Sequence, residues 1–362
     1  MISIPKGSTV GPSNPLVVFY SQQNGRLVDL ASLEFQVFDL TKTANAISPA
    51  RVVPVLPGPP DREAVDVNAN RIGLGRYAPT FTLPSVAGLY RIVWFWKFDA
   101  SGAEFTATQD FEAIDGSVAS ADGYALVSDL KAECVEATSD VQIQVAIKIA
   151  SRLIDSITGR SFGARYATHN FDGRESRALL LWEPVIAVES IRFEEDTPVD
   201  LDVVRVYNRH LSGLIAPDDR NDPKIEFEHG RDLLGAYSEV SLYGIRRPGV
   251  QSRIGLGIFP FGVQNVEVVG VFGYTEADGS PWGKVPDLIR HATKLIAVRE
   301  LPTLGESACR SATRDGWRIV EEKTRDQSVK YANPRKFGQW IGDADIDSIL
   351  SMFLRPPMLG SV

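Results

Sequence analysis

The chain has 362 residues, 44% of them hydrophobic and 23% charged, which is the composition of a soluble globular protein of about two or three domains. Asp and Glu outnumber Lys and Arg by 46 to 38. The resulting net charge of −8 excludes a general nucleic-acid binder, which needs a basic surface to neutralise phosphates. No apolar run reaches the roughly eighteen residues of a transmembrane helix, so no membrane association is expected.

The N-terminal region, residues 1–115, consists of short β-rich segments separated by turn signals. Asn24-Gly25 predicts a hairpin turn, and Asp99–Gly102 predicts the loop between the last two segments. About six or seven short strands in a region of this length are typical of an immunoglobulin-like β-sandwich. A small, polar linker is expected to follow at 116–123.

One predicted strand of this region, Ile92–Phe98, is apolar on both faces, and Trp94 and Trp96 share one of them. The pattern favours a central strand of the sandwich, covered on both sides. The alternative is a face that binds a partner or stacks a sugar ring on the two tryptophans. The sequence does not separate these interpretations.

The most informative segment is Ser128–Phe162. Its apolar spacing predicts a short helix followed by a long one, and Gly159 fits the left-handed residue that ends a helix. The main apolar row of the long helix consists of Ile143, Ala146, Ile147, Ala150, Leu153, Ile154 and Ile157. A second row, Val141, Val145 and Ile149, lies on another side. The helix is therefore either buried within its own domain or packed on one side against a neighbouring subunit.

Three motifs resemble those of phage head-tail connector (adaptor) proteins. The first is the end of the long helix, Ile147–Phe162, with the sequence IKIASRLIDSITGRSF. The second is a strand signal, LWEPVIAVESI, at Leu181–Ile191. The third is GYT at Gly273–Thr275, followed by Val285-Pro286, which opens a helix. From about Gly123 to its C-terminus, the chain is similar to that family.

The resemblance implies a connector domain at 124–362. Its helices are expected at 128–158, 286–301 and 344–354. Strand signals at about 196–275 indicate a β insertion between the helices, and residues 355–362 form a tail that needs a surface to lie on. The predicted fold class is α+β and multidomain: an N-terminal all-β immunoglobulin-like sandwich followed by a helical connector domain carrying a β insertion.

No residue pattern indicates an enzyme. Gly73–Ala78 reads G-x-G-x-x-A, but Pro79 follows at once and no helix start is available to hold phosphates. Asp343–Asp347 resembles the start of an EF-hand loop but lacks the later glycine and glutamate. Cys134 and Cys309 are far apart, without metal-ligand spacing. We therefore expect no catalytic residue, no metal site and no cofactor.

The resemblance also implies a function. The chain is expected to be a structural virion protein of the phage neck, assembled in the host cytoplasm. It would form a ring of about twelve copies that joins the portal protein to a tail or stopper protein. DNA would pass through the ring without its sequence being read. The alternative is a host-surface or glycan-binding virion module that acts through the N-terminal sandwich.

Three sets of residues are candidates for these contacts. The candidate subunit interface is the second apolar row of the long helix, Val141, Val145 and Ile149. The candidate portal-docking residues are Ile346, Ile349, Leu350, Phe353, Arg355, Pro356, Pro357, Met358 and Leu359. The candidate contacts to DNA phosphates in the channel are Arg246, Arg247 and Arg253.

Overall fold

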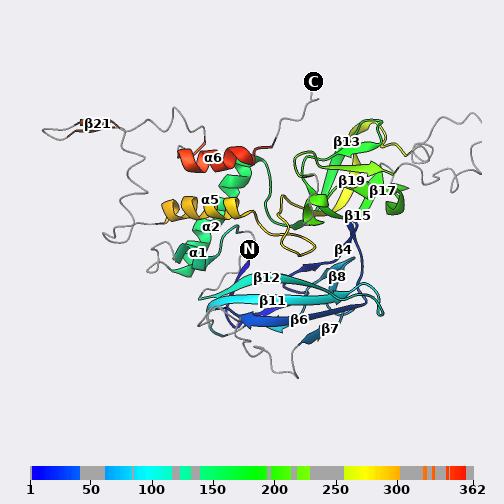
Figure 1. The fold of residues 1–362 in the computed structure, drawn as a ribbon, viewed down its shortest axis with the longest axis horizontal. Helices are drawn as coiled ribbons and strands as arrows, with labels where there is room; N and C mark the ends of the chain where they lie inside the picture. Colours follow the sequence, from blue (N-terminus) through cyan, green and yellow to red (C-terminus); the bar gives the residue numbers. More distant parts are fainter. Residues whose placement is uncertain are drawn as a thin grey trace, which may run out of the picture.

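In the computed structural model of the chain, helices and strands occupy separate regions of the molecule. Figure 1 shows the helices on the left, a sheet from the N-terminal part of the chain below, and a second group of strands on the right. The structure describes residues 2–40, 62–83, 85–115, 123–131, 139–193, 197–212, 218–228, 257–301, 321–323, 328–330, 340–341 and 343–355.

The N-terminal part of the chain forms a sheet with the strand order β1-β12-β11-β6-β7. Its strands are β1 (Ile2–Pro5), β6 (Ser32–Asp39), β7 (Glu63–Val65), β11 (Gly88–Lys97) and β12 (Phe105–Ile114). Buried and half-buried residues alternate along all of β6, because Leu33, Phe35 and Val37 point to the same face. β1 runs parallel to β12, whereas the other pairs are antiparallel.

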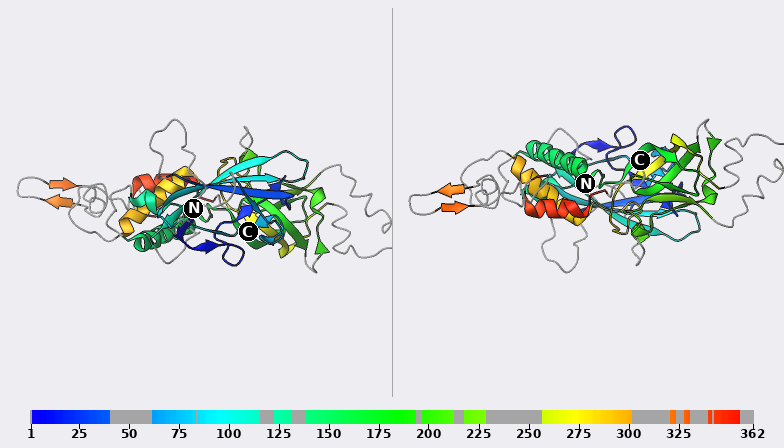
Figure 2. Two further views of the ribbon diagram at one scale, coloured as in Figure 1. Left: turned by 90° about the horizontal axis from the view of Figure 1, so that it is seen from below. Right: turned by 90° about the horizontal axis from the view of Figure 1, so that it is seen from above.

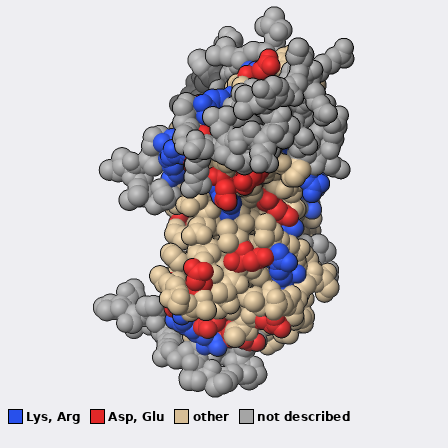
Figure 3. All heavy atoms as spheres, turned by 90° about the vertical axis from the view of Figure 1, so that its right-hand side faces the viewer, with Lys and Arg blue, Asp and Glu red and all other residues tan. Residues whose placement is uncertain are grey.

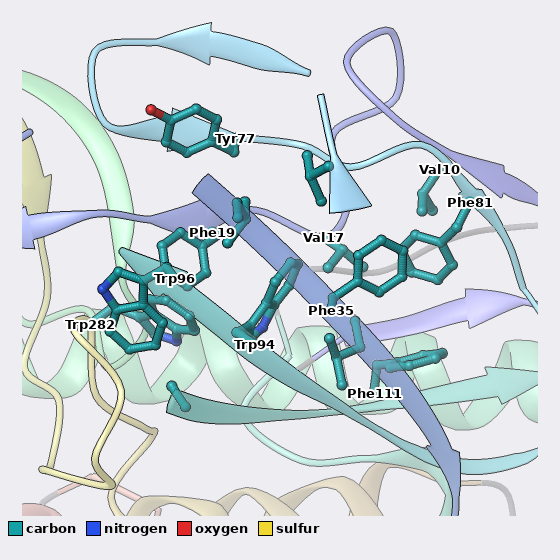
Figure 4. Packing of buried hydrophobic residues seen from close by; sticks show 14 of the residues in the cluster. Val10, Val17, Phe19, Phe35, Tyr77, Phe81, Trp94, Trp96, Phe111 and Trp282 are labelled. Carbon is teal, nitrogen blue, oxygen red and sulfur yellow. The ribbon is translucent and has the colours of Figure 1, made fainter. Parts of the chain in front are cut away.

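Five shorter strands among the described residues lie around the same core, and all of them except β8 contribute buried side chains to it. They are β2 (Thr9–Val10), β3 (Phe19–Tyr20), β8 (Arg71–Gly73), β9 (Arg76–Tyr77) and β10 (Phe81–Thr82). The ring of Phe19 lies 5.2 Å from Trp94 and 5.1 Å from Trp96, measured between ring centroids (Figure 4). Trp282, from the other half of the chain, lies 5.2 Å from the same ring. The N-terminal core is therefore not closed by residues 1–115 alone.

The second sheet also combines strands from both halves of the chain, in the order β13-β19-β15-β5-β4. These strands are β4 (Gln22–Gln23), β5 (Arg26–Leu27), β13 (Arg165–Gly173), β15 (Val185–Phe193) and β19 (Gly262–Phe272), and β16 (Thr197–Pro198) pairs with β15. The β4–β5 hairpin turns at Gly25, which has a φ of 77°. The Gly25 carbonyl accepts the N–H of Val188 at 2.8 Å, which joins the hairpin to β15.

A three-stranded sheet packs beside the second sheet. It contains β14 (Ala178–Leu180), β17 (Val204–Val206) and β18 (Lys224–Phe227), with the 3-10 helices η2 (Leu201–Val203) and η3 (Arg209–Ser212) nearby in sequence. Ile225 and Phe227 share a buried cluster with Phe259 and with residues of β15 and β19. A separate pair is formed by β20 (Glu321–Lys323) and β21 (Ser328–Lys330).

The α-helices of the described residues share one core. They are α1 (Val127–Lys131), α2 (Asp140–Thr158), α5 (Asp287–Glu300) and α6 (Ala344–Met352). α2 begins after Ser139, whose hydroxyl accepts the N–H of Gln142, and ends at the left-handed Gly159. α6 begins after Asp343, whose carboxylate caps its first turn. None of the described helices combines the length and apolar character that crossing a membrane requires.

The predicted fold class is wrong in its second part. Strand makes up 40% and helix 22% of the described residues, so the C-terminal region is not a helical connector domain with a β insertion. β13 and β15 precede the expected insertion at 196–275, yet they pair with β19 in one sheet that the β4–β5 hairpin extends. The first four residues of β15 are all buried. The sequence signals this strand, but a strand covered on both faces carries no alternating pattern that would show how it is placed in a sheet.

Candidate interaction surfaces

The candidate subunit-interface residues lie on the exposed side of α2. Val141, Val145 and Ile149 are 37%, 53% and 48% exposed, and Leu153, one turn further, is 39% exposed. These four residues follow one another at i, i+4 spacing, which places them in one row along the helix. We call this set the outer row of α2.

The opposite side of α2 explains why the outer row stays exposed. Ile143, Ile147 and Ile154 are buried in the core that α2 shares with α5 and α6. α2 is apolar on two sides, and the described residues that pack against it lie on only one of them, so its second apolar row is exposed. Leu153, which its spacing assigned to the main row, belongs to the outer row because its neighbour Ile154 takes the place in the core.

Positive charge accompanies the outer row. Arg152 is exposed and Lys148 is half-buried, whereas Asp140 is buried and Asp155 is half-buried. Asp155 accepts the hydroxyl proton of Tyr124 at 2.5 Å. Burial raises the pKa of the Asp155 carboxyl to about 6, and the bond from Tyr124 opposes that shift. The exposed side of α2, a helix described along its whole length, is therefore apolar and basic.

The predicted portal-docking residues on α6 are mostly buried. Ile346 and Leu350 lie in the helical core, and the Phe353 ring lies 5.5 Å from Phe162 and 5.7 Å from Tyr274. These α6 side chains therefore form no free docking surface in this structure. The reason is that α6 has a single apolar row, which the core of its own chain covers.

Of the remaining predicted contact residues, the structure describes two and the others lie outside the described residues. Ile349 is half-buried at the edge of the helical core, and the guanidinium of Arg355 lies 5.8 Å from the ring centre of Trp182. The other predicted portal-docking residues, Pro356, Pro357, Met358 and Leu359, lie outside the described residues. The predicted DNA contacts Arg246, Arg247 and Arg253 also lie outside them.

The exposed side of α6 differs from that of α2. Asp345, Ser348 and Met352 are exposed, Met352 by 61%, and their i, i+3, i+7 spacing places them on one face. We call this set the outer face of α6. α6 contains no basic residue, so its outer face is acidic at the N-terminal end and apolar at the C-terminal end. Sequence reasoning missed this face because it singled out only the larger apolar residues of the helix.

A buried arginine joins the ends of α2 and α6. Arg160, from the Thr158-Gly159-Arg160 motif, donates hydrogen bonds to the carbonyls of Arg220 at 3.1 Å and Leu354 at 3.4 Å. Its guanidinium lies 4.6 Å from the ring centre of Tyr274. Burial lowers the pKa of Arg160, and the neighbouring Arg355 and Arg220 act in the same direction. The motif therefore has a structural role here.

A buried carboxyl lies where the N-terminal sheet meets the helices. Glu112 of β12 accepts the backbone N–H groups of Val127 at 2.7 Å and Ser128 at 2.8 Å, at the start of α1. Burial raises the pKa of Glu112 to about 7, although these hydrogen bonds oppose the shift. This contact ties α1 to the sheet.

The aromatic residues proposed to stack a sugar are not accessible. Trp94 and Trp96 are buried in the N-terminal core, where both contact Phe19 (Figure 4). Burial on this face agrees with the central-strand interpretation of Ile92–Phe98. The two tryptophans therefore offer no surface to a glycan.

Neither a continuous basic area on the face seen in Figure 3 nor a metal-binding cluster is found among the described residues. On the face seen in Figure 3, acidic and basic side chains are interspersed, and the described residues form no continuous basic area. No cluster of His, Cys, Asp and Glu among the described residues is suited to hold a metal ion. His169 and Arg165, both of β13, lie 3.1 Å and 2.8 Å from the buried Glu183 carboxylate, which belongs to the turn between β14 and β15.

Comparison of the chain with known protein families, curated proteins and solved structures finds no match.

Proposed function

We propose that this chain is a structural protein of a phage neck, which associates with further copies of itself into a ring between the portal protein and the tail. Two observations support the proposal: the three connector-like motifs and the outer row of α2. The outer row is the stronger support, because it is an exposed apolar surface on which another copy could pack. The proposal does not require a helical connector domain, which this chain lacks.

The outer row is more than the scattered surface hydrophobicity of an ordinary protein. Its four aliphatic side chains form one continuous row about 18 Å long, from the rise per residue of an α-helix. Single exposed apolar residues need no explanation, but a continuous row marks an interaction site. Burying the exposed parts of these side chains would favour association by on the order of 4 kcal/mol. In a ring the same contact is repeated between every pair of neighbouring copies.

The charge of the chain suits a protein through which DNA passes. A net charge of −8 repels phosphates, so DNA in a central channel would slide without being held. The portal protein above the ring and a tail or stopper protein below it are the proposed partners. The virion neck is the proposed location.

Electron microscopy of the purified full-length protein, alone and mixed with its portal protein, tests this function. We expect rings with a central opening, formed by the chain alone or on the portal. Val145→Asp should remove the rings, because it places a charge in the middle of the outer row. Val86→Asp, at a valine that is 59% exposed elsewhere, is the matched control and should leave them intact. Single-copy particles in both wild-type samples would contradict the proposal.

A further inference from the structure

We infer that the outer row of α2 packs against the outer face of α6 in the next copy of the chain, as an antiparallel, head-to-tail contact. This inference rests on the proposed function, since it names the surface that completes self-association. It follows from the charges of the two surfaces, the spacing of their side chains and their positions in the molecule.

Charge opposes the simplest alternative, in which the outer rows of two copies pack against each other. Such a two-fold contact would bring two exposed Arg152 side chains into one interface, and α2 has no fully exposed acid to offset them. Juxtaposed like charges disfavour a partly desolvated contact. The partner of the outer row must therefore be acidic as well as apolar.

The outer face of α6 meets both requirements. Asp345 provides an exposed carboxylate, and Met352, 61% exposed, provides a flexible apolar side chain. Ser348, between them, is small enough for another helix to approach closely. α6 contains no basic side chain that would repel Arg152.

The two surfaces also match in spacing and length. Along α2 the residues 152, 149 and 145 are separated by three and then four positions, as are 345, 348 and 352 along α6. An antiparallel arrangement therefore places three pairs opposite one another in a single register. These pairs are Arg152 with Asp345, Ile149 with Ser348, and Val145 with Met352. α6 is about 14 Å long and covers most of the 18 Å of the outer row, at about 1.5 Å per residue.

The positions of the helices make the contact head-to-tail. α5 packs against both α2 and α6. Both views of Figure 2 show α2 along one edge of the helical group and α6 along the other edge. Each copy can therefore offer its outer row to one neighbour and its outer face to another. A contact between two different surfaces generates a ring when its rotation closes.

Charge reversal tests the register. Arg152→Glu and Asp345→Arg should each weaken self-association about tenfold, because each places like charges opposite one another. The chain that carries both substitutions should associate like the wild type, since every contact regains an opposite-charge pair. A double variant no better than the weaker single variant would overturn the register.

Mixing complementary variants tests the contact itself. Val145→Asp blocks the outer row and Met352→Asp blocks the outer face, so each full-length variant should be monomeric in native mass spectrometry. Their mixture should form a dimer and nothing larger, because only one intact pair of surfaces remains. Absence of that dimer, or rings formed by Met352→Asp alone, would overturn the inference. In the latter case the proposed function stands, whereas a wild type that is monomeric both alone and with its portal protein would refute the proposed function.

Discussion

α2 and α6 are both amphipathic helices of the same core, but they differ in how many of their apolar rows are buried. α6 has one apolar row, and Ile346, Leu350 and Phe353 bury it inside the chain. α2 has two apolar rows and buries only one, leaving four aliphatic side chains exposed. The two helices also differ in charge on their exposed sides, basic on α2 and acidic on α6.

This difference shows which apolar rows on a helix indicate a partner. A single row is needed for the helix to pack within its own chain, so it carries no information about partners. A second apolar row, on a side that no described residue covers, lowers solubility and therefore indicates a site for a partner. We therefore expect substitutions in the buried rows to change folding stability and substitutions in the outer row to change association.

The largest expected effect is on α6. Phe353→Ala removes a ring packed against Phe162 and Tyr274, so it should lower the free energy of unfolding by about 3–5 kcal/mol. Met352→Ala, one residue away and exposed, should change it by less than about 0.5 kcal/mol. Urea denaturation followed by circular dichroism measures both values. Equal losses in the two variants would show that the apolar row of α6 is not core.

Two isoleucines of α2 provide the closest comparison. Ile147 is 3% exposed and Ile149 is 48% exposed, on the same helix and two positions apart. Ile147→Ala should lower the free energy of unfolding by about 2–4 kcal/mol, because it leaves a cavity in the helical core. Ile149→Ala should change the free energy of unfolding little and weaken self-association instead. Both quantities are measured on each variant, by denaturation below the association concentration and by light scattering above it.

A substitution of Arg160 tests whether its hydrogen bonds stabilise the contact between the C-terminal ends of α2 and α6. Arg160→Lys keeps the charge but loses the planar fork that reaches the carbonyls of Arg220 and Leu354. We expect a loss of about 1–3 kcal/mol in the free energy of unfolding, because buried carbonyls lose their donors. Arg152→Lys, at an exposed arginine of α2, is the control and should be neutral in thermal denaturation. A neutral Arg160→Lys would show that the motif does not stabilise this contact.

The smallest effect concerns pH. The pKa of Asp155 is raised in the folded chain to about 6, above its ordinary value of 3.8. The folded state therefore binds this proton more tightly, and stability falls as pH rises from about 4 to 6. Because Asp155 is partly exposed, we expect a loss of only about 1 kcal/mol over this window. Asp155→Asn should lack this part of the pH dependence, and denaturation curves at pH 4, 5 and 6 measure the difference between the two proteins.

Local patterns in the sequence place the helices but not their environment. The apolar spacing near residues 140–158 and the proline before residue 287 are properties of short segments, so α2 and α5 can be located from the sequence. The second apolar row of α2 is equally visible, since it needs only the helical repeat. Whether Ile346 packs inside the chain or outside it depends on residues far away, and the helical repeat does not contain that information.

Strand pairing between distant segments was beyond sequence reasoning for the same reason. The β4–β5 hairpin is signalled by Asn24-Gly25, but nothing in those residues identifies β15 as its partner. Trp282 completes an aromatic core whose other members lie in the N-terminal part. These long-range contacts join the two halves of the chain through shared strands and a shared core, and no local pattern in the sequence indicates them.

The most direct test of the account is the mass in solution of wild type and Ile149→Asp, measured by light scattering after size-exclusion chromatography at equal concentration. The account predicts a multiple of the chain mass of 39.7 kDa for the wild type and a single chain, with unchanged thermal stability, for the variant. If both proteins have the same mass, whether monomeric or assembled, the outer row of α2 is not the surface that joins the copies.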